Sequence, residues 1–311
     1  MKNYARGGNV PYRWEDPLFK GVTFLFALFI LLLTLFIAFS LLVHATPAIK
    51  KFGFEFLWGT TWDPVSEQFS ALPFLYGTLI TAVIALLTAV PIGLFVSIFL
   101  SEFSPRWLSD PVSYLIDLLA AIPSVIYGII GLFVLVPLMR GNIEPALSNS
   151  IGFLPVFQGP FYGVGILTAG LLLSMMILPF IISISREVML SVPQTQREAI
   201  LSLGATQWEM VYKVVMPLSR SGIIGSIFLA LARALGETMA VTMVIGNNPD
   251  IPLSFFEPGH TMAAVIANEF TEAASELYLS ALIEIGLILF LVSFVVNGIA
   301  RILIPGGVRA A

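Results

Sequence analysis

The chain has 311 residues, of which 58% are hydrophobic and 11% are charged, and its formal net charge is −4. Soluble proteins carry roughly 25% charged residues and need a largely polar surface. This chain has less than half that share of charged residues, and its mean hydropathy is +0.95. This composition excludes a soluble globule and predicts that lipid covers much of the chain. Because there is no cysteine and the two histidines, His44 and His260, are far apart, we expect no metal site. The absence of a basic cluster argues against nucleic-acid binding.

The amino-terminal region predicts a retained membrane span. Residues 1–21 are polar and basic, and they precede an apolar run at 22–44. This run is longer than the apolar core of a signal peptide, which has about 7 to 15 residues. We therefore expect 1–21 to be a cytoplasmic segment, 22–44 to be the first transmembrane span and 45–75 to be an external loop.

Apolar runs recur along the rest of the chain. A transmembrane helix needs about 20 apolar residues. Runs of about this length occur at 22–44, 76–101, 112–138, 161–185, 221–246 and 280–304. Pro91, Pro123 and Pro179 are expected to interrupt three of these spans. The sequence thus predicts an all-α membrane protein with about six transmembrane helices, a core at 76–304 and a cytoplasmic tail at 305–311.

Basic residues are divided unevenly between the two sides of these spans. Eleven of the 15 Lys and Arg residues fall on the face that holds both termini, three fall on the opposite face, and Arg233 lies inside a span. Because basic loops tend to stay in the cytoplasm, we predict a multi-pass protein of the cytoplasmic membrane with both termini cytoplasmic.

The longest cytoplasmic connection, 186–220, contains helix signals and is not typical of a flexible linker. Pro193 suits the first turn of a helix that runs to Leu203. Gly204 suits the end of this helix, where a glycine is common. A short helix that lies across the cytoplasmic face can act as a rigid lever on which another protein pushes.

A second helix is predicted to follow this glycine. Thr206 and Glu209 have the Thr-x-x-Glu spacing of a capping box, which marks a helix start. Proline lacks an amide hydrogen and normally breaks a helix interior. We expect the second helix to reach Met216 and to stop at Pro217.

The spacing within this loop carries a family resemblance. Glu198, Ala199 and Ile200 are followed by Gly204 and then by Val214–Pro217. This order resembles the EAA segment of ABC importer permeases, although Ile200, Val214 and Met216 each replace one apolar residue of that pattern by another. In that family the segment is the coupling helix, which docks in a groove of the ATPase subunit. The residues that the resemblance assigns to ATPase coupling are Glu198, Ala199, Gly204, Thr206, Glu209 and Pro217. An ordinary loop helix with a cap and a turn is the alternative.

An ATP-driven transporter of this kind needs its nucleotide site on another chain. A P-loop requires Gly-Lys followed by Ser or Thr, and none of the five lysines here follows a glycine. We therefore expect a transport subunit without enzyme activity or a cofactor of its own. ATP and Mg would be bound, and ATP hydrolysed, on a partner ATPase.

One basic residue lies inside a predicted span. Arg233 is near the middle of 221–246, and Glu237 follows about 6 Å along the helix, on the same face. An intramembrane arginine is costly and usually faces a cavity, a partner or a substrate path. Its planar guanidinium matches an oxyanion in a bidentate manner. Arg233 is thus a candidate contact for a transported anion, with Glu237 holding it while the site is empty; a structural ion pair that braces helix packing is the alternative.

The residues around this pair carry a narrower resemblance. Residues 233–241, which include Thr238, resemble the Arg-x-x-Gly-Glu-Thr stretch of phosphate-specific ABC importer permeases, and the Met-Ala-Val continuation is similar to that of the PstC-type subunit. Further matches are Trp62-Asp63-Pro64, Leu75–Leu79 and Ile122–Gly128. The resemblance extends from about residue 20 to residue 304. It implies a type I ABC importer permease fold with cytoplasmic coupling helices, in the inner membrane of a prokaryote.

This resemblance also implies partners and a cargo. The partners are a second, PstA-type permease subunit, two PstB-type ATPase subunits and an external PstS-type phosphate-binding protein. The cargo is inorganic phosphate, with Arg233, Glu237 and Thr238 along its path.

The outer loops bear on how such a cargo arrives. They carry a net charge of −6, which repels free phosphate and favours delivery by a docked binding protein. A merely solvated acidic face is the alternative. Another oxyanion, such as sulfate or molybdate, also stays open as cargo, and an ion-coupled secondary transporter or channel is a rival that would need no ATPase.

Overall fold

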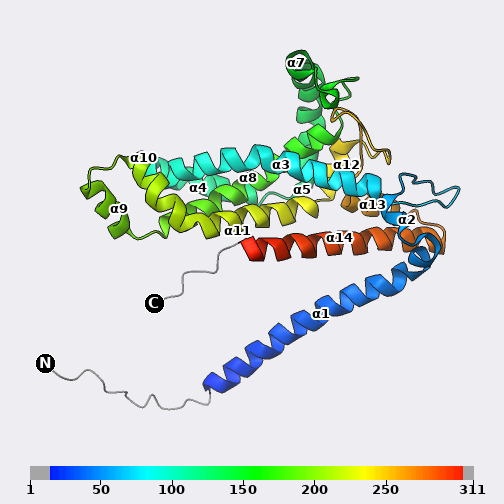
Figure 1. Ribbon diagram of the computed structural model, residues 1–311, viewed down its shortest axis with the longest axis horizontal. Coiled ribbons are helices and arrows are strands. Elements are labelled where there is room, and N and C mark those ends of the chain that lie inside the picture. The colour runs from blue at the N-terminus through cyan, green and yellow to red at the C-terminus, as the bar shows by residue number, and fades with distance from the viewer. Residues whose placement is uncertain (1–14, 304–311) are drawn as a thin grey trace.

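The molecule is an elongated bundle of helices with shorter helices at its ends (Figure 1). The structure is a computed structural model and describes residues 15–303. The long helices are α1 (Glu15–Phe52), α3 (Leu72–Ile98), α8 (Ile166–Leu190), α11 (Met216–Leu235) and α14 (Glu276–Leu303). The shorter helices are α2 (Glu55–Trp58), α4 (Arg106–Ala120), α5 (Ser124–Ile130), α6 (Val136–Leu138), α7 (Glu144–Ile151), α9 (Gln194–Ser202), α10 (Gln207–Met210), α12 (Met239–Ile245) and α13 (Met262–Glu269). The π-helical turns are η1 (Phe99–Phe103), η2 (Gly131–Leu135), η3 (Met139–Ile143) and η5 (Val211–Val215), and the 3₁₀ turn is η4 (Pro155–Phe157).

Six helical stretches in the described part of the chain are long and apolar enough to cross a membrane. They are Pro17–Phe52, Leu72–Phe103, Ser124–Ile151, Ile166–Leu190, Gln207–Leu235 and Glu276–Ile302. Their number confirms the prediction, and the chain is a multi-pass membrane protein. Helix α1 begins and α14 ends toward the end of the bundle that carries α9 and α10, as an even number of crossings requires (Figure 1). The predicted segment 305–311 and most of 1–21 lie outside the described residues.

The third predicted span, 112–138, is not one continuous helix. The chain breaks between α4 and α5 at residues 121–123. Pro123 has no amide hydrogen and disfavours a helical conformation of the residue before it. The Tyr127 hydroxyl crosses the break and donates to the Leu119 carbonyl at 2.9 Å. The apolar stretch then runs beyond the predicted end into α7, which points away from the bundle (Figure 1).

The two other prolines that were expected to interrupt spans do not end a helix. Pro91 lies inside α3 and Pro179 lies inside α8, and both helices continue past them. A proline in a membrane helix is tolerated where neighbouring helices and side chains compensate for the lost backbone hydrogen bond. Pro179 is buried between such neighbours.

The fifth predicted span, 221–246, is also broken. Helix α11 ends at Leu235 and α12 begins at Met239, so Gly236–Thr238 is not part of either helix. Glycine weakens a helix interior and is favoured at helix ends. The Thr238 hydroxyl donates to the Gly236 carbonyl at 3.3 Å, a local bond that competes with helical geometry. Residues on the two sides of this break therefore do not share one helix face.

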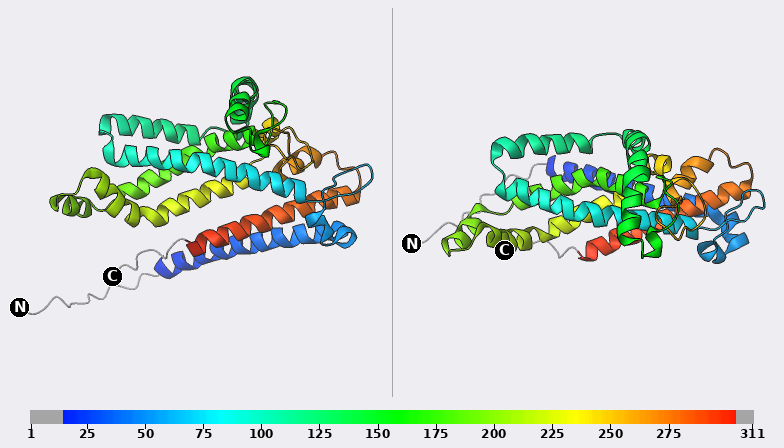
Figure 2. Two further views of the ribbon diagram at one scale, coloured as in Figure 1. Left: turned by 45° about the horizontal axis from the view of Figure 1, so that its top comes forward. Right: turned by 90° about the horizontal axis from the view of Figure 1, so that it is seen from above.

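Helix α8 forms the centre of the bundle. In its most apolar window 72% of the residues are buried, the largest share among the six stretches. Leu172, Leu173 and Ile177 are fully buried in a cluster with residues of α3, α11 and α12. Gly93 of α3 allows close approach to this helix, because a Cβ there would lie 2.8 Å from Ile181 Cγ2. Helix α1, by contrast, is peripheral and packs along α14 (Figure 2).

The predicted external loop, 45–75, is ordered around an aromatic cluster. Part of it is helical, because α1 extends to Phe52 and α2 follows. Trp62 packs edge-on against Phe69 and Phe74, with ring centroids 4.8 Å apart in each pair. Glu269 of α13 accepts hydrogen bonds from Trp62 Nε1 at 2.8 Å and from the Tyr278 hydroxyl at 2.5 Å. These bonds tie the segment to α13 and α14.

Candidate functional site

The predicted coupling segment lies at one end of the bundle as two short helices (Figure 1). Helix α9 has Pro193 as its N-cap and ends just before Gly204. Gly204 has φ +88°, a left-handed conformation that favours glycine. The capping box is present: the Thr206 hydroxyl accepts from the Glu209 N–H at 3.2 Å, and Glu209 Oε2 accepts from the Thr206 N–H at 2.9 Å. These features confirm the two predicted helix starts and the turn between them.

The prediction that the second helix stops at Pro217 is wrong. Helix α10 passes through η5 directly into α11, which carries Pro217 in its first turn. In a π turn the backbone bonds join residues five apart, which loosens the helix before the proline. The regular α-helical hydrogen bonding that a proline would disrupt is therefore already interrupted before Pro217. The coupling segment is therefore continuous with the fifth membrane stretch.

The residues that the family resemblance assigns to ATPase coupling lie at the surface. Glu198, Ala199, Gly204, Thr206 and Pro217 are exposed, and Glu209 is partly exposed. Leu203, which is 87% exposed, and Trp208 add an apolar area to this surface that the sequence analysis missed. An apolar residue at the end of a short polar helix was the available signal for Leu203. Exposed leucine and tryptophan beside polar groups are typical of a protein-docking surface.

Arg233 and Glu237 do not form the predicted pair. Arg233 lies in the last turn of α11, whereas Glu237 lies beyond the end of that helix. The Arg233 guanidinium lies over the Phe180 ring of α8, 4.5 Å from its centroid. Glu237 accepts a hydrogen bond from the Ala240 N–H at 3.3 Å, at the start of α12. Among residues 15–303 no ion pair joins the two side chains, because the helix break separates their faces.

Arg233 keeps donors that can bind an anion. Its side chain is exposed, and a guanidinium stacked on an aromatic face still presents its N–H groups in its own plane. A planar oxyanion face fits this fork. Thr238 lies in the break that follows α11, but its hydroxyl donates to the Gly236 carbonyl. The structure thus places Arg233 in the helical turn before the break and Thr238 within the break, and Glu237 accepts a hydrogen bond at the start of α12.

The chain matches a known family of membrane transport proteins. The family described as binding-protein-dependent transport system inner membrane component matches residues 89–306. Two relatives named phosphate transport system permease protein PstC extend the match over nearly the whole chain. The Haemophilus influenzae protein is 49% identical over 94% of this chain and 93% of its own length, and the Pasteurella multocida protein is 48% identical over 97% and 96%. This chain belongs to the PstC family.

A solved structure supports the fold of this PstC-family chain. A crystal structure of a bacterial ABC transporter involved in the import of the acidic polysaccharide alginate aligns with a TM-score of 0.59 and 15% identity. The alignment covers 94% of this chain and 99% of that one. At this identity the likeness shows the fold alone. It confirms the predicted permease fold of ABC importers.

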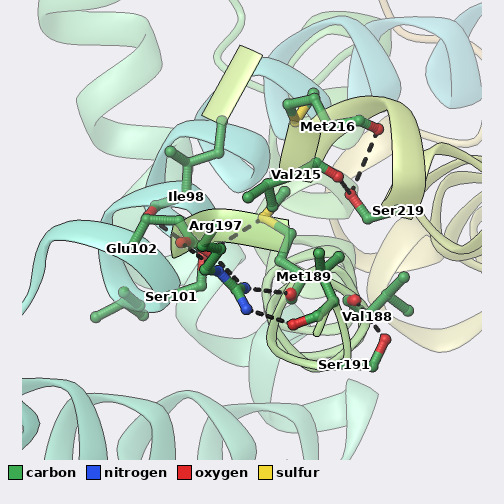
Figure 3. A network of polar contacts seen from close by, with 12 residues as sticks. Ile98, Ser101, Glu102, Val188, Met189, Ser191, Arg197, Val215, Met216 and Ser219 are labelled. Carbon is green, nitrogen blue, oxygen red and sulfur yellow. Dashed lines mark hydrogen bonds and ion pairs between the residues drawn. The ribbon is translucent and has the colours of Figure 1, made fainter. Parts of the chain in front are cut away.

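The PstC-family chain also holds a buried ion pair that the sequence analysis missed. Arg197, which precedes the exposed Glu198 on α9, points inward and meets Glu102 of η1 (Figure 3). The two side chains are 10% and 4% exposed. An arginine within the coupling sequence and an acidic residue at the end of the second span were the signals that could have revealed the pair.

Proposed function

We propose that this chain is one of two permease subunits of an importer that carries inorganic phosphate across the cytoplasmic membrane. ATP hydrolysis on separate ATPase subunits drives the transport. The observation that carries the proposal is the combination, in one PstC-family chain, of an exposed coupling surface and an intramembrane arginine with free donors. The names of the relatives favour phosphate over sulfate or molybdate as the cargo.

In this proposal Arg233 binds the anion transiently. Its guanidinium offers parallel N–H donors to two oxygens of phosphate. The Phe180 ring stabilises the cation when no anion is present, so Glu237 need not serve as its counter-ion. Glu237 instead orients the start of α12. The Thr238 hydroxyl, which donates to the Gly236 carbonyl, can still accept a hydrogen bond from a protonated oxygen of phosphate. A cation–π contact is weaker than a buried ion pair, so the anion can compete for the arginine and leave again.

Delivery of phosphate and coupling to the ATPase take place at opposite ends of the helical bundle. A PstS-type binding protein brings phosphate to the acidic outer face, which would repel the free anion. At the other end, a PstB-type ATPase, which holds ATP and Mg, docks on the surface formed by α9 and α10. The stretch Gln207–Leu235 joins that surface to Arg233 without a loop, so a push on α10 reaches the arginine through continuous helix. A PstA-type subunit completes the permease.

Proteoliposomes test this proposal. The chain is co-purified with its second permease subunit and its ATPase, reconstituted with ATP inside, and supplied with the binding protein outside. We expect uptake of radioactive phosphate that requires ATP and the binding protein and that excess sulfate or molybdate does not inhibit. Uptake of sulfate or molybdate in place of phosphate would contradict the cargo. Uptake that persists without ATP and collapses with the ion gradient would contradict the ATP-driven mechanism.

A further inference from the structure

Arg197 is the one residue of α9 that is buried. Its Nε donates to Glu102 Oε2 at 3.1 Å and its Nη2 donates to Glu102 Oε1 at 2.9 Å, a bidentate pair. Nη2 also donates to the Met189 carbonyl at 2.8 Å (Figure 3). Nη1 donates to the Val192 carbonyl. One side chain therefore joins α9 to the end of the second membrane stretch and to the end of the fourth.

Little else fastens the body of α9 to the bundle. Glu198 and Ala199 face outward, and Ile200 contributes partly buried apolar contact at the rim of a cluster. A cavity of about 660 Å³ lies beside the helix, and its lining includes Gln194, Arg197 and Leu201. Apolar packing against an open cavity leaves a helix free to shift, whereas a bidentate pair fixes both distance and orientation. The attachment of α9 is thus mainly polar and directional.

We infer that the Arg197–Glu102 pair is a clamp that makes α9 move together with the ends of α3 and α8, a role that rests on the ATP-driven transport proposed above. A displacement of α9 by a docked ATPase then reaches α8, whose Phe180 carries the Arg233 guanidinium. Without the clamp α9 can rotate beneath the ATPase while the membrane helices stay in place. Arg197 and Glu102 are positioning residues, since neither lies at Arg233 or on the exposed docking surface.

The test compares phosphate transported per ATP hydrolysed in proteoliposomes for four variants of the assembled complex. Arg197→Lys keeps the charge and loses the fork, Glu102→Gln loses the acceptor charge, and the double Arg197→Gln, Glu102→Gln variant leaves no unpaired buried charge. The exposed Arg220→Lys change is the matched control. We expect normal ratios for the control and ratios lower by about tenfold for the other three, a coupling loss in the usual range between linked sites.

Hydrogen exchange and the phosphate-to-ATP ratio together distinguish a clamp on α9 from a contact that only stabilises the fold. They also distinguish failure of the clamp from an error in the assigned cargo. Hydrogen exchange of the purified complex, which needs no transported cargo, is expected to be faster in α9 of Arg197→Lys and unchanged in α3. A double variant that assembles and regains the full phosphate-to-ATP ratio would overturn the clamp, as would unchanged exchange in α9. If the unaltered complex hydrolyses ATP but moves no phosphate, the proposed cargo fails, and the exchange measurement still decides the clamp.

Discussion

The guanidinium of Arg233 lies over an aromatic ring, and this contact changes how an intramembrane charge is interpreted. A structural brace would need a counter-ion, yet Glu237 is committed to the start of α12. The Phe180 ring stabilises the charge of Arg233 without occupying the N–H donors of the guanidinium. At the scale of single residues, the geometry favours an arginine that is ready for a passing oxyanion.

Substitution of Arg233 by glutamine is expected to lower phosphate uptake without loss of assembly. Glutamine keeps a polar group and loses the charge, so charge-assisted hydrogen bonds to the anion are lost and uptake falls by about ten- to a hundredfold. Uptake and the yield of assembled complex are measured together, with the exposed Arg301→Gln as the matched control. Full uptake by Arg233→Gln would contradict the anion contact.

The companion change, Glu237→Gln, tests the cap. Glutamine can still accept a hydrogen bond from the Ala240 N–H, so assembly should persist. The double Arg233→Gln, Glu237→Gln variant should remain inactive. Recovery of uptake in the double variant would restore the ion-pair interpretation.

His260 should make the end of the molecule that carries the aromatic cluster around Trp62 sensitive to acid. It is 2% exposed, packs on Phe74 with ring centroids 5.4 Å apart, and accepts a hydrogen bond from the Thr261 N–H through Nδ1. Burial lowers the pKa of His260 from 6.5 to about 4. As the pH falls, the imidazole of His260 is therefore protonated in the unfolded chain before it is protonated in the folded chain. The stability that the folded chain has from the buried, neutral imidazole is complete above pH 6.5 and is lost as the pH falls toward 4.

We expect the unfolding free energy to be about 2 kcal/mol lower at pH 5 than at pH 7.5 through this residue. Thermal unfolding in detergent is compared at the two pH values for the natural chain and for His260→Gln. The variant should show a smaller pH dependence, whatever its stability at pH 7.5. An equal pH dependence in both proteins would show that His260 does not carry the effect.

At the scale of elements, the proposed coupling surface on α9 and α10 depends on the turn between these two short helices. Gly204 has φ +88°, and a Cβ built there would meet no atom within 4 Å. The backbone conformation, and not crowding, therefore restricts this position. Helix α10 continues through η5 into α11, so we expect a change in the turn that displaces α10 to reach one end of a membrane stretch.

Gly204→Val is expected to weaken or uncouple the ATPase while the chain still inserts. A β-branched residue is disfavoured at positive φ, and the strain is about 1 to 3 kcal/mol. Gly204→Asn is the matched control, because asparagine tolerates this region better. Co-purification with the ATPase and phosphate moved per ATP are measured for both variants. Normal transport by Gly204→Val would remove the lever role of this turn.

At the scale of the whole molecule, six membrane stretches place the start of α1 and the end of α14 toward the same end as α9 and α10 (Figure 1). The distribution of basic residues predicts that this end is cytoplasmic. The aromatic cluster around Trp62 and the acidic segment 247–279 then lie on the outer side. Orientation stays a proposal from charge, since the fold is the same whichever way it is inserted.

Reporter fusions check this orientation. Fusions at both termini should be active as cytoplasmic reporters, and fusions within 247–279 should be active as external ones. A fusion after Gly204, in the turn between α9 and α10, serves as a third cytoplasmic point. An external carboxyl terminus together with a cytoplasmic amino terminus would contradict six crossings, and external fusions at both termini would contradict the orientation.

The amino-acid sequence by itself determined the features whose signals are local. The apolar length of 22–44 required a membrane helix, and the Thr206–Glu209 spacing and Gly204 marked the helix ends of the coupling segment, because caps and turns depend on residues a few positions apart. The family was also evident from short motifs, and the comparisons confirm it.

Tertiary structure decided the rest. The break at Gly236–Thr238 separates Arg233 from Glu237, although their spacing suits one helix face, and the π turn before Pro217 carries a helix past a residue that normally ends one. Arg197 and Glu102 are 95 positions apart and meet only because α9 folds back under the end of α3. Such contacts depend on how helices pack around α8, and the energy of that packing is shared among many distant residues, so no short stretch of sequence contains it.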